Sequence, residues 1–333
     1  TYTAEITPDG IGDLTVAVAA DAVTDAAGNG SAEATATSVF ESAWGLVWSD
    51  EFEGGSLDPV NWTARTDADC DPDTFPCDGV QSYLTERVTL ADGLLKIEAQ
   101  AGTPFTSGLI DTRDKRALRY GRVEIDAIMP GTQGTLPSLF LLPAIPGGET
   151  LPVYGPWPQS GEIDLVNAPN LGPSNSTLEH TLRYGLPDPE DTATTAMSVA
   201  PGVPTVDIIE YAIEWEGGEI RWFVNGIHVA TQTQDNWYAY FEDADGVYTL
   251  GTDAEPFDQD FYVAIGLAVG NDADSFFPQT LEIDAVRVYQ CVNPVDPAAG
   301  AGCSTGSSAS PSRATDTRDR LVTIPSTRRS ACS

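Results

Sequence analysis

The sequence is poor in basic residues. Lysine occurs at only two positions, Lys96 and Lys115, and lysine and arginine together number 16 against 50 aspartates and glutamates. The formal net charge of −34 at pH 7 would repel the phosphates of nucleic acids, so we exclude nucleic acid as a partner. An acidic, lysine-poor surface is typical of proteins that stay dissolved in salty water, and a high-GC bias of the gene is a second explanation.

Long apolar runs are also absent. No run approaches the roughly 18 residues that a membrane-spanning helix needs, so we expect no membrane span. The 31 glycines, the 24 prolines and the 9% of aromatic residues favour many strands and turns over long helices. At 333 residues, the chain has room for one large all-β domain and smaller additional parts.

Cysteine is scarce, with five residues in all. Cys70 and Cys77 bracket one short loop, Cys291 and Cys303 bracket another, and both spacings are compatible with a local disulfide. Neither pair has a neighbouring His or second Cys pair that would indicate zinc. Because disulfides persist in oxidising compartments, we expect a secreted or cell-surface protein. Cys332 is left without a candidate partner.

The two ends of the chain differ in composition from its middle. Residues 1–39 alternate small apolar and polar residues, and Asp25–Asn29 resembles the closing strands of bacterial Ig-like repeats. An Ig-type sandwich needs about 100 residues, so we interpret this piece as a partial Ig-like spacer. Because the sequence starts with Thr1 rather than Met, we expect a fragment of a larger multidomain precursor. Residues 304–333, rich in Ser, Thr and Arg, are predicted to be disordered.

Residues 44–291 carry short β-like runs between turn signals, without helical periodicity between them. This pattern predicts an all-β, two-sheet sandwich or jelly roll. One run, Glu162–Val166, would as a strand place Glu162 and Asp164 on one face. Two carboxylates held about 6–7 Å apart along a strand tune each other's ionisation. Glycoside hydrolysis uses such pairs, one attacking the sugar and another group protonating the leaving oxygen.

The order and spacing of several blocks over about residues 44–290 resemble glycoside hydrolase family 16. This resemblance implies a β-jelly-roll (concanavalin-like) fold and a polysaccharide partner of the β-1,3-glucan type, with laminarin as the expected ligand. No organic cofactor is expected. The blocks are Leu46–Phe52, Thr106–Gly108 with Thr112 and Arg113, Tyr120–Glu124, Trp157–Pro158 with Gly161–Asp164, Tyr211–Trp215, Pro256–Gln259, Leu267–Gly270 and Ile283–Tyr289.

The active strand of that family reads E-x-D-x-x-E, with the first Glu as nucleophile and the last as acid/base. The resemblance therefore makes Glu162 the nucleophile and Asp164 the middle carboxylate, and it places Asn167 in the acid/base position. The step from the first to the last Glu changes strand parity, so the strand must carry a β-bulge. Without a bulge the acid would fall at Val166, which is not an acid either.

Three interpretations of Asn167 are open. The acid is lost and a sugar-binding cleft remains; or a slow enzyme uses the amide as a neutral hydrogen-bond donor, which cannot transfer a proton; or another carboxyl has moved in. Glu179 is the candidate for the third, because it shares strand parity with Thr181 and Arg183.

The leading hypothesis is a glucan-binding domain with absent or weak hydrolysis, so whether the protein is an enzyme is left open. The first alternative is an active retaining endo-β-1,3-glucanase with Glu162 as nucleophile. The second is a structural cell-surface module without sugar binding.

Further site residues follow from the same resemblance. Trp157 is expected to stack on a sugar ring, with a core tryptophan as the alternative. Gln81 and Arg113 match polar cleft positions, and Arg183 stands where the family usually has a histidine.

A structural calcium is also implied by the resemblance. Its ligands would be Glu51, Asp284 and a backbone carbonyl, that of Gly93. Ordinary surface carboxylates are an equal alternative in so acidic a chain.

Overall fold

The computed structural model describes residues 2–6, 12–18, 34–40, 44–77, 79–171, 177–185, 191–198, 205–242, 248–251, 253–271, 273, 278–291, 294–296, 301–303 and 320–324. The chain divides into two compact units. One is formed by residues 46–290, and the other by residues 1–45 together with residues 291–333. We describe each unit separately.

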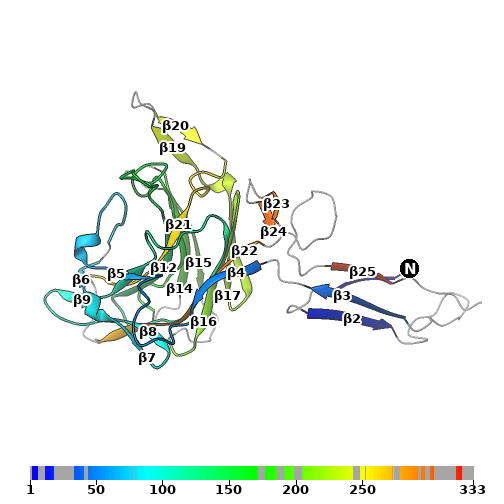
Figure 1. Ribbon diagram of the computed structural model, residues 1–333, viewed down its shortest axis with the longest axis horizontal. Helices are drawn as coiled ribbons and strands as arrows, with labels where there is room; N and C mark the ends of the chain where they lie inside the picture. Colours follow the sequence, from blue (N-terminus) through cyan, green and yellow to red (C-terminus); the bar gives the residue numbers. More distant parts are fainter. Residues whose placement is uncertain are drawn as a thin grey trace, which may run out of the picture. The chain divides into compact units, whose positions relative to one another are not determined.

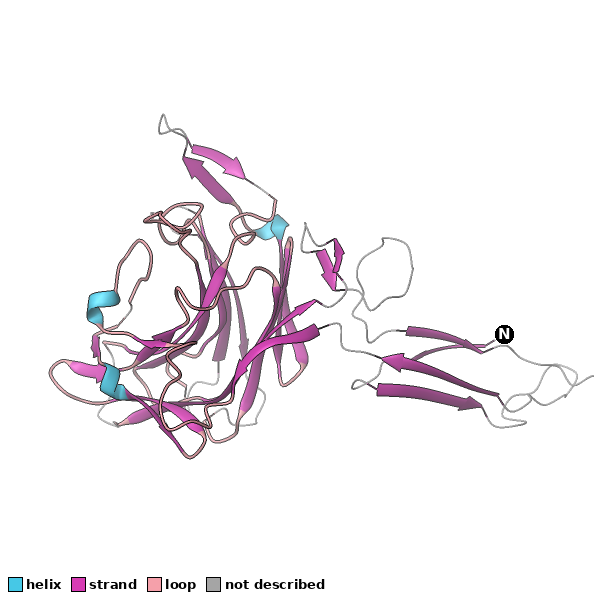
Figure 2. Cartoon of the chain, viewed as in Figure 1, coloured by secondary structure: helices cyan, strands magenta, loops and turns pink. Residues whose placement is uncertain are grey.

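The larger unit is a sandwich of two antiparallel sheets (Figures 1 and 2). Its described residues contain no α-helix, and only three short 3₁₀ turns, Asp67–Asp69, Thr85–Arg87 and Gln234–Asn236, interrupt the strands and loops. The seven-stranded sheet has the order β15 (Asp191–Ser198), β14 (Thr177–Tyr184), β13 (Glu162–Asn167), β12 (Thr135–Pro143), β21 (Phe261–Val269), β10 (Leu109–Asp111) and β5 (Thr63–Ala64).

The eight-stranded sheet lies on the other side of the core. Its order is β18 (Ile227–Thr233), β17 (Glu219–Val224), β16 (Ile209–Glu216), β11 (Gly121–Ile128), β22 (Gln279–Cys291), β8 (Leu94–Ala99) and β7 (Val88–Ala91), and β4 (Trp44–Asp50) also pairs with β22. Two short pairs complete the unit, β6 (Gln81–Tyr83) with β9 (Phe105–Ser107) and β19 (Ala239–Glu242) with β20 (Tyr248–Gly251).

The burial of successive side chains shows which strands are covered on one face and which on both. In β8 and β11, every second residue is buried and the intervening ones are partly exposed, as expected for strands with one covered face. In β13 and β21, by contrast, every residue is buried. The core between the sheets contains large side chains such as Trp62, Trp215 and Trp222, each at most 1% exposed. The predicted all-β sandwich is confirmed.

The smaller unit consists of paired strands. β2 (Gly12–Val18) pairs with β3 (Ala34–Phe40), both inside the segment predicted to be Ig-like. β1 (Tyr2–Ile6) pairs with β25 (Arg320–Ile324), so five residues of the tail predicted to be disordered form a strand. The rest of residues 304–333, Cys332 included, lies outside the described residues. The remaining pair is β23 (Pro294–Asp296) with β24 (Ala301–Cys303).

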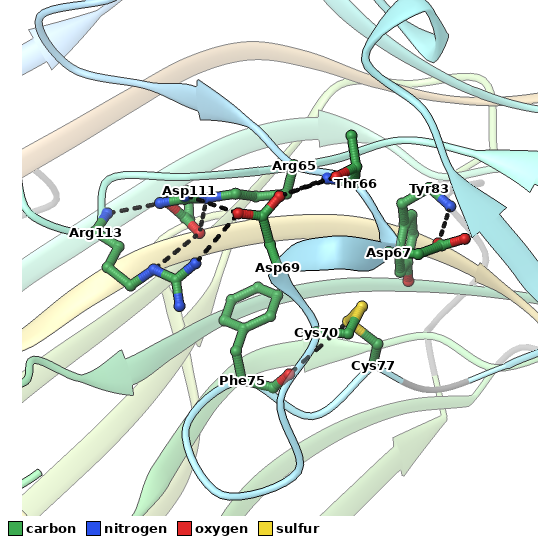
Figure 3. Close-up of a disulfide and its surroundings, with 10 residues drawn as sticks. All are labelled: Arg65, Thr66, Asp67, Asp69, Cys70, Phe75, Cys77, Tyr83, Asp111 and Arg113. Carbon is green, nitrogen blue, oxygen red and sulfur yellow. Dashed lines mark hydrogen bonds and ion pairs between the residues drawn. A yellow bond between two sulfur atoms is a disulfide. The ribbon is translucent and has the colours of Figure 1, made fainter. Parts of the chain in front are cut away.

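A disulfide closes one loop beside the seven-stranded sheet. Cys70 and Cys77 are bonded to each other, as their spacing predicted (Figure 3). Inside this loop the Phe75 ring is fully buried and stacks on Tyr262 at 6.5 Å between ring centroids. Cys291 is also disulfide-bonded. Among the described residues, no helix is long and apolar enough to cross a membrane.

Candidate active site

Strand β13 carries a bulge between Asp164 and Asn167, directly after the Glu-x-Asp run. Its register with β14 pairs Asp164 with Thr181 and Asn167 with Glu179, so three steps on β13 oppose two steps on β14. One residue of β13 is therefore extra, which is the definition of a β-bulge. The bulge that the motif requires is confirmed. It lets Asn167 line the same cavity as Glu162, although the two residues differ in strand parity.

Two core side chains bind the backbone of this bulge. His180 donates from Nδ1 to the Leu165 carbonyl at 2.5 Å, and Trp222 donates from Nε1 to the Asp164 carbonyl at 2.8 Å. A carbonyl only accepts, so Nδ1 of His180 carries the hydrogen. Burial lowers the pKa of His180, which favours the neutral ring. Sequence reasoning assigned His180 no role, but its parity, opposite to that of Glu179 and Thr181, already indicated an inward-facing side chain.

Glu162 is held by donors from two directions. The Trp157 indole donates from Nε1 to Oε2 at 2.6 Å, and the Arg183 Nε lies 3.4 Å from Oε1. The backbone N–H of Trp157 in turn donates to the Asp73 carbonyl at 2.6 Å, which ties it to the disulfide loop. The predicted residues Trp157, Glu162 and Arg183 are thus brought together, with Glu162 only 8% exposed.

Asp164 lies deeper than Glu162, at 1% exposure, and neither of its carboxylate oxygens has a hydrogen-bond partner. Arg183 Nε approaches to 3.8 Å. Burial first, and then the charge of Glu162, raise the pKa of Asp164 well above its ordinary value, against the opposing effects of Arg183 and Asn167. A protonated Asp164 can donate a hydrogen bond toward Glu162, a carboxylate that it would otherwise repel.

These groups open into a cavity of about 240 Å³. Its floor comes from β12, β13, β14 and β21, and one wall comes from the disulfide loop through Phe75, Pro76 and Cys77. Sequence reasoning had not assigned this loop to the site. The polar lining is Ser138, Glu162, Asn167, Glu179 and Arg183, and the aromatic lining is Phe75, Tyr83, Phe140 and Trp157.

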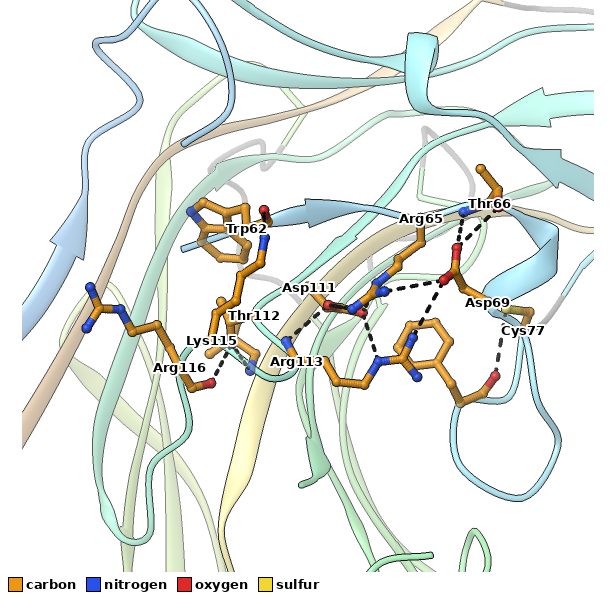
Figure 4. A network of polar contacts seen from close by, with 12 residues as sticks. Trp62, Arg65, Thr66, Asp69, Cys77, Asp111, Thr112, Arg113, Lys115 and Arg116 are labelled. Atoms are coloured by element: carbon orange, nitrogen blue, oxygen red, sulfur yellow. Dashed lines mark hydrogen bonds and ion pairs between the residues drawn. The ribbon is translucent and has the colours of Figure 1, made fainter. Parts of the chain in front are cut away.

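Two residues predicted to bind substrate lie outside this lining. The Gln81 side-chain oxygen accepts a hydrogen bond from the backbone N–H of Val269 at 2.6 Å. The Arg113 guanidinium lies over the Phe75 ring, 5.2 Å from its centroid, and 3.9 Å from Asp69. Figures 3 and 4 show Arg113 beside Asp69 and beside the bidentate ion pair of Arg65 with Asp111 (2.7 and 2.8 Å). Arg113 therefore supports the wall rather than facing the cavity.

Glu51, Gly93 and Asp284 are the residues predicted to bind calcium. Both carboxylate oxygens of Glu51 accept hydrogen bonds from Arg287, at 3.1 and 2.5 Å. The carboxylate that lies against Gly93 is that of Glu53. The described residues contain no group of three or more His, Cys, Asp or Glu side chains able to hold a metal ion. A calcium ion bound by Glu51, Asp284 and the Gly93 carbonyl has only two carboxylate ligands and stays a prediction.

Comparison with known proteins shows which family and which relatives this chain resembles. The family described as glycosyl hydrolases family 16 matches residues 80–253. The chain is 31% identical over 271 residues to glucan endo-1,3-beta-glucosidase A1 of Niallia circulans, covering 74% of this chain and 38% of that protein. It is 34% identical over 277 residues to a beta-glucanase of Rhodothermus marinus, covering 75% and 86%.

The chain is also similar to a glucan-binding protein and to a solved laminarinase structure. A beta-1,3-glucan-binding protein of Penaeus monodon is 28% identical over 244 residues, covering 69% of this chain and 60% of that protein. The X-ray structure of the laminarinase from Rhodothermus marinus superposes with a TM-score of 0.61 at 29% identity, covering 75% of this chain and 98% of that one. The jelly roll that the sequence predicts is confirmed by this neighbour.

Proposed function

This chain belongs to glycosyl hydrolases family 16, and on that premise we propose that its cleft binds a β-1,3-linked glucan of the laminarin type and hydrolyses it only weakly. One observation carries the proposal. The nucleophile position, Glu162, keeps its partners in the cleft, while the acid position at the far side of the bulge holds Asn167. The cleft is thus built to hold a sugar but lacks the expected proton donor.

The chemistry follows from what each side chain can give. Glu162 offers a carboxylate that can attack the anomeric carbon, and the half-buried Trp157 offers an apolar ring to the C–H face of a sugar. The Asn167 amide can donate a hydrogen bond to the glycosidic oxygen but cannot transfer a proton to it. Losing general acid catalysis typically lowers a rate by about 10²–10⁴. Relatives of this chain are named both as glucanases and as a glucan-binding protein, which supports a binding cleft of either kind.

A secreted or cell-surface location forms part of the proposal. The disulfide between Cys70 and Cys77 supports it, because such bonds persist in oxidising compartments. The acidic net charge of −34 is compatible with a neutral polysaccharide as the ligand, since no attraction between opposite charges is required.

The test compares binding with hydrolysis in the same preparations. We expect affinity electrophoresis in laminarin to retard the wild type, and Trp157→Ala to weaken this retardation at least about tenfold. Trp157→Phe, the matched control, keeps an aromatic ring and should retain most of the affinity. Release of reducing ends should be slow in the wild type and rise by about 10² or more in Asn167→Glu. Absence of binding by the wild type would overturn the proposal in favour of a structural module.

A further inference from the structure

The strand next to β13 presents a second carboxylate to the cavity. We infer that Glu179 is the proton donor and acceptor of the residual hydrolysis, in place of the group that Asn167 cannot supply. The inference rests on the proposed glucan site and assigns the acid/base within it. Of the described residues, Glu162 and Glu179 are the two carboxylates that line the cavity, because Asp164 lies beneath it.

The bulge sets the position of Glu179. In the ladder between β13 and β14, Glu179 is directly opposite Asn167, whereas an unbulged strand would bring Val166 to that place. Directly opposite residues in antiparallel strands have Cβ atoms about 4.5–5.5 Å apart and point to the same face. The Glu179 side chain therefore starts about one strand spacing from the acid position, a gap comparable to its own length.

The surroundings of Glu179 differ from those of Glu162. Glu162 accepts a hydrogen bond from Trp157 and faces Arg183 at 3.4 Å. No hydrogen bond or ion pair joins the Glu179 carboxylate to another side chain in the part of the chain that the structure describes. Its side chain is partly exposed to the cavity. The oxygens of Glu179 are thus available to a ligand, and the neighbouring Asn167 amide can orient them or the leaving oxygen.

The reaction balances with these two carboxylates and one water. In the first step, a Glu162 oxygen bonds to the anomeric carbon, the bond to the leaving oxygen breaks, and the Glu179 carboxyl proton passes to that oxygen. In the second step, Glu179 removes a proton from water, the water oxygen bonds to the anomeric carbon, and the bond to Glu162 breaks. The net change is hydrolysis of one glycosidic bond, with both side chains restored.

The experiment compares Glu179→Gln with Glu149→Gln, an exposed loop carboxylate that serves as the matched control. We expect Glu179→Gln to lower laminarin hydrolysis at least about 10²-fold without a change in laminarin affinity or in the thermal unfolding curve. Formation of the glycosyl enzyme from a dinitrophenyl β-laminaribioside should hardly change, because that leaving group needs no proton. Azide should then restore turnover by attacking the glycosyl enzyme, giving the β-glycosyl azide.

The remaining outcomes separate the two proposals. Laminarin hydrolysis that Glu162→Gln abolishes and Glu179→Gln leaves unchanged overturns the role of Glu179 and keeps the proposed function. Binding of laminarin by the wild type without any hydrolysis also overturns the role of Glu179, since no reaction remains to be assigned. A wild type that does not bind laminarin overturns both proposals.

Discussion

The carboxylates on the two sheets of the sandwich differ in how closely arginines contact them. On the eight-stranded sheet, Arg122 contacts three glutamates at 2.6–3.2 Å, and Arg221 contacts three at 3.0 Å. On the seven-stranded sheet, Glu162 and Asp164 share Arg183 at 3.4 and 3.8 Å, and the Asp164 oxygens have no hydrogen bond. The buried Asp164 carboxylate thus lacks the close partners of the glutamates on the other sheet, whereas Glu162 has Trp157 as well as Arg183.

The spacing of the acidic residues in the sequence does not reveal this difference in partners. Glu214 and Glu216 on β16 stand two residues apart around Trp215, just as Glu162 and Asp164 stand around Ile163. Arg221 lies 3.0 Å from both Glu214 and Glu216. An acidic pair at this spacing therefore indicates a site only once the partners of both carboxylates are known. Substitutions of Arg122 and Asp164 test this contrast, and a third, of His180, tests the bulge next to Asp164.

The largest change in stability is expected from removing an arginine that contacts several glutamates. Arg122→Met leaves partly buried glutamates facing one another, and breaking such an ion pair typically costs about 3–5 kcal/mol in the free energy of unfolding. Urea denaturation measures this loss, and laminarin binding should be unchanged. The matched control is Arg119→Met. Arg119 and its partner Asp260 are both more than half exposed, so we expect a loss of at most about 0.5 kcal/mol in the free energy of unfolding. Equal losses in the two variants would contradict the contrast.

An intermediate effect is expected at the bulge. His180→Leu leaves the buried Leu165 carbonyl without its donor, which typically costs about 1–3 kcal/mol. Since burial lowers the pKa of His180 in the folded state, the unfolded state binds more protons below about pH 6.5. The wild type should therefore lose this contribution as the pH falls, and the stability gap to His180→Leu should be widest above pH 7. A gap independent of pH, or an equal gap for the exposed His228→Leu, would count against this account.

The smallest effect has the opposite sign. Asp164→Asn removes a buried carboxylate with no hydrogen bond, and we expect a gain on the order of 1 kcal/mol at pH 8. The pKa of Asp164 is raised in the folded state, so the wild type keeps full stability at low pH and loses it as the pH rises through that pKa. The gain should therefore vanish near pH 4. Urea denaturation at several pH values measures it.

The matched control for Asp164 lies on the other sheet. Glu216→Gln removes a carboxylate that Arg221 contacts at 3.0 Å, so this variant should lose stability at pH 8. A loss for both variants would show that Asp164, like Glu216, serves the fold, and hydrolysis of laminarin should then be unaffected by Asp164→Asn.

The fold could be predicted because its signals are local. Alternating burial in β8 and β11 corresponds to alternating apolar residues in the sequence, and the turns between strands are marked by Gly and Pro. The bulge could be predicted as well, because the family resemblance places Asn167 in the acid position, and its strand parity differs from that of Glu162. The disulfide between Cys70 and Cys77 could be predicted from the spacing of the two cysteines alone.

The rest of the site depends on contacts that spacing does not contain. Trp222 binds the Asp164 carbonyl from a strand of the other sheet, a contact that only the packing of the two sheets sets. Gln81 and Arg113 matched polar positions of the family along the chain, but a match along the chain does not fix the direction of a side chain. Nor does the sequence indicate that Glu51, predicted to bind calcium, contacts Arg287.

The hairpin of β13 and β14 has a consequence for how this chemistry can be inherited. Trp157, Glu162, Asn167, Glu179 and Arg183 all belong to one continuous stretch of the chain, residues 157–184. Replacement of that stretch as a whole would exchange the proposed attacking group, its partners and the proposed acid position together, while the rest of the sandwich stayed as it was. Gain or loss of catalysis among descendants of this domain should therefore map to one short block of the gene.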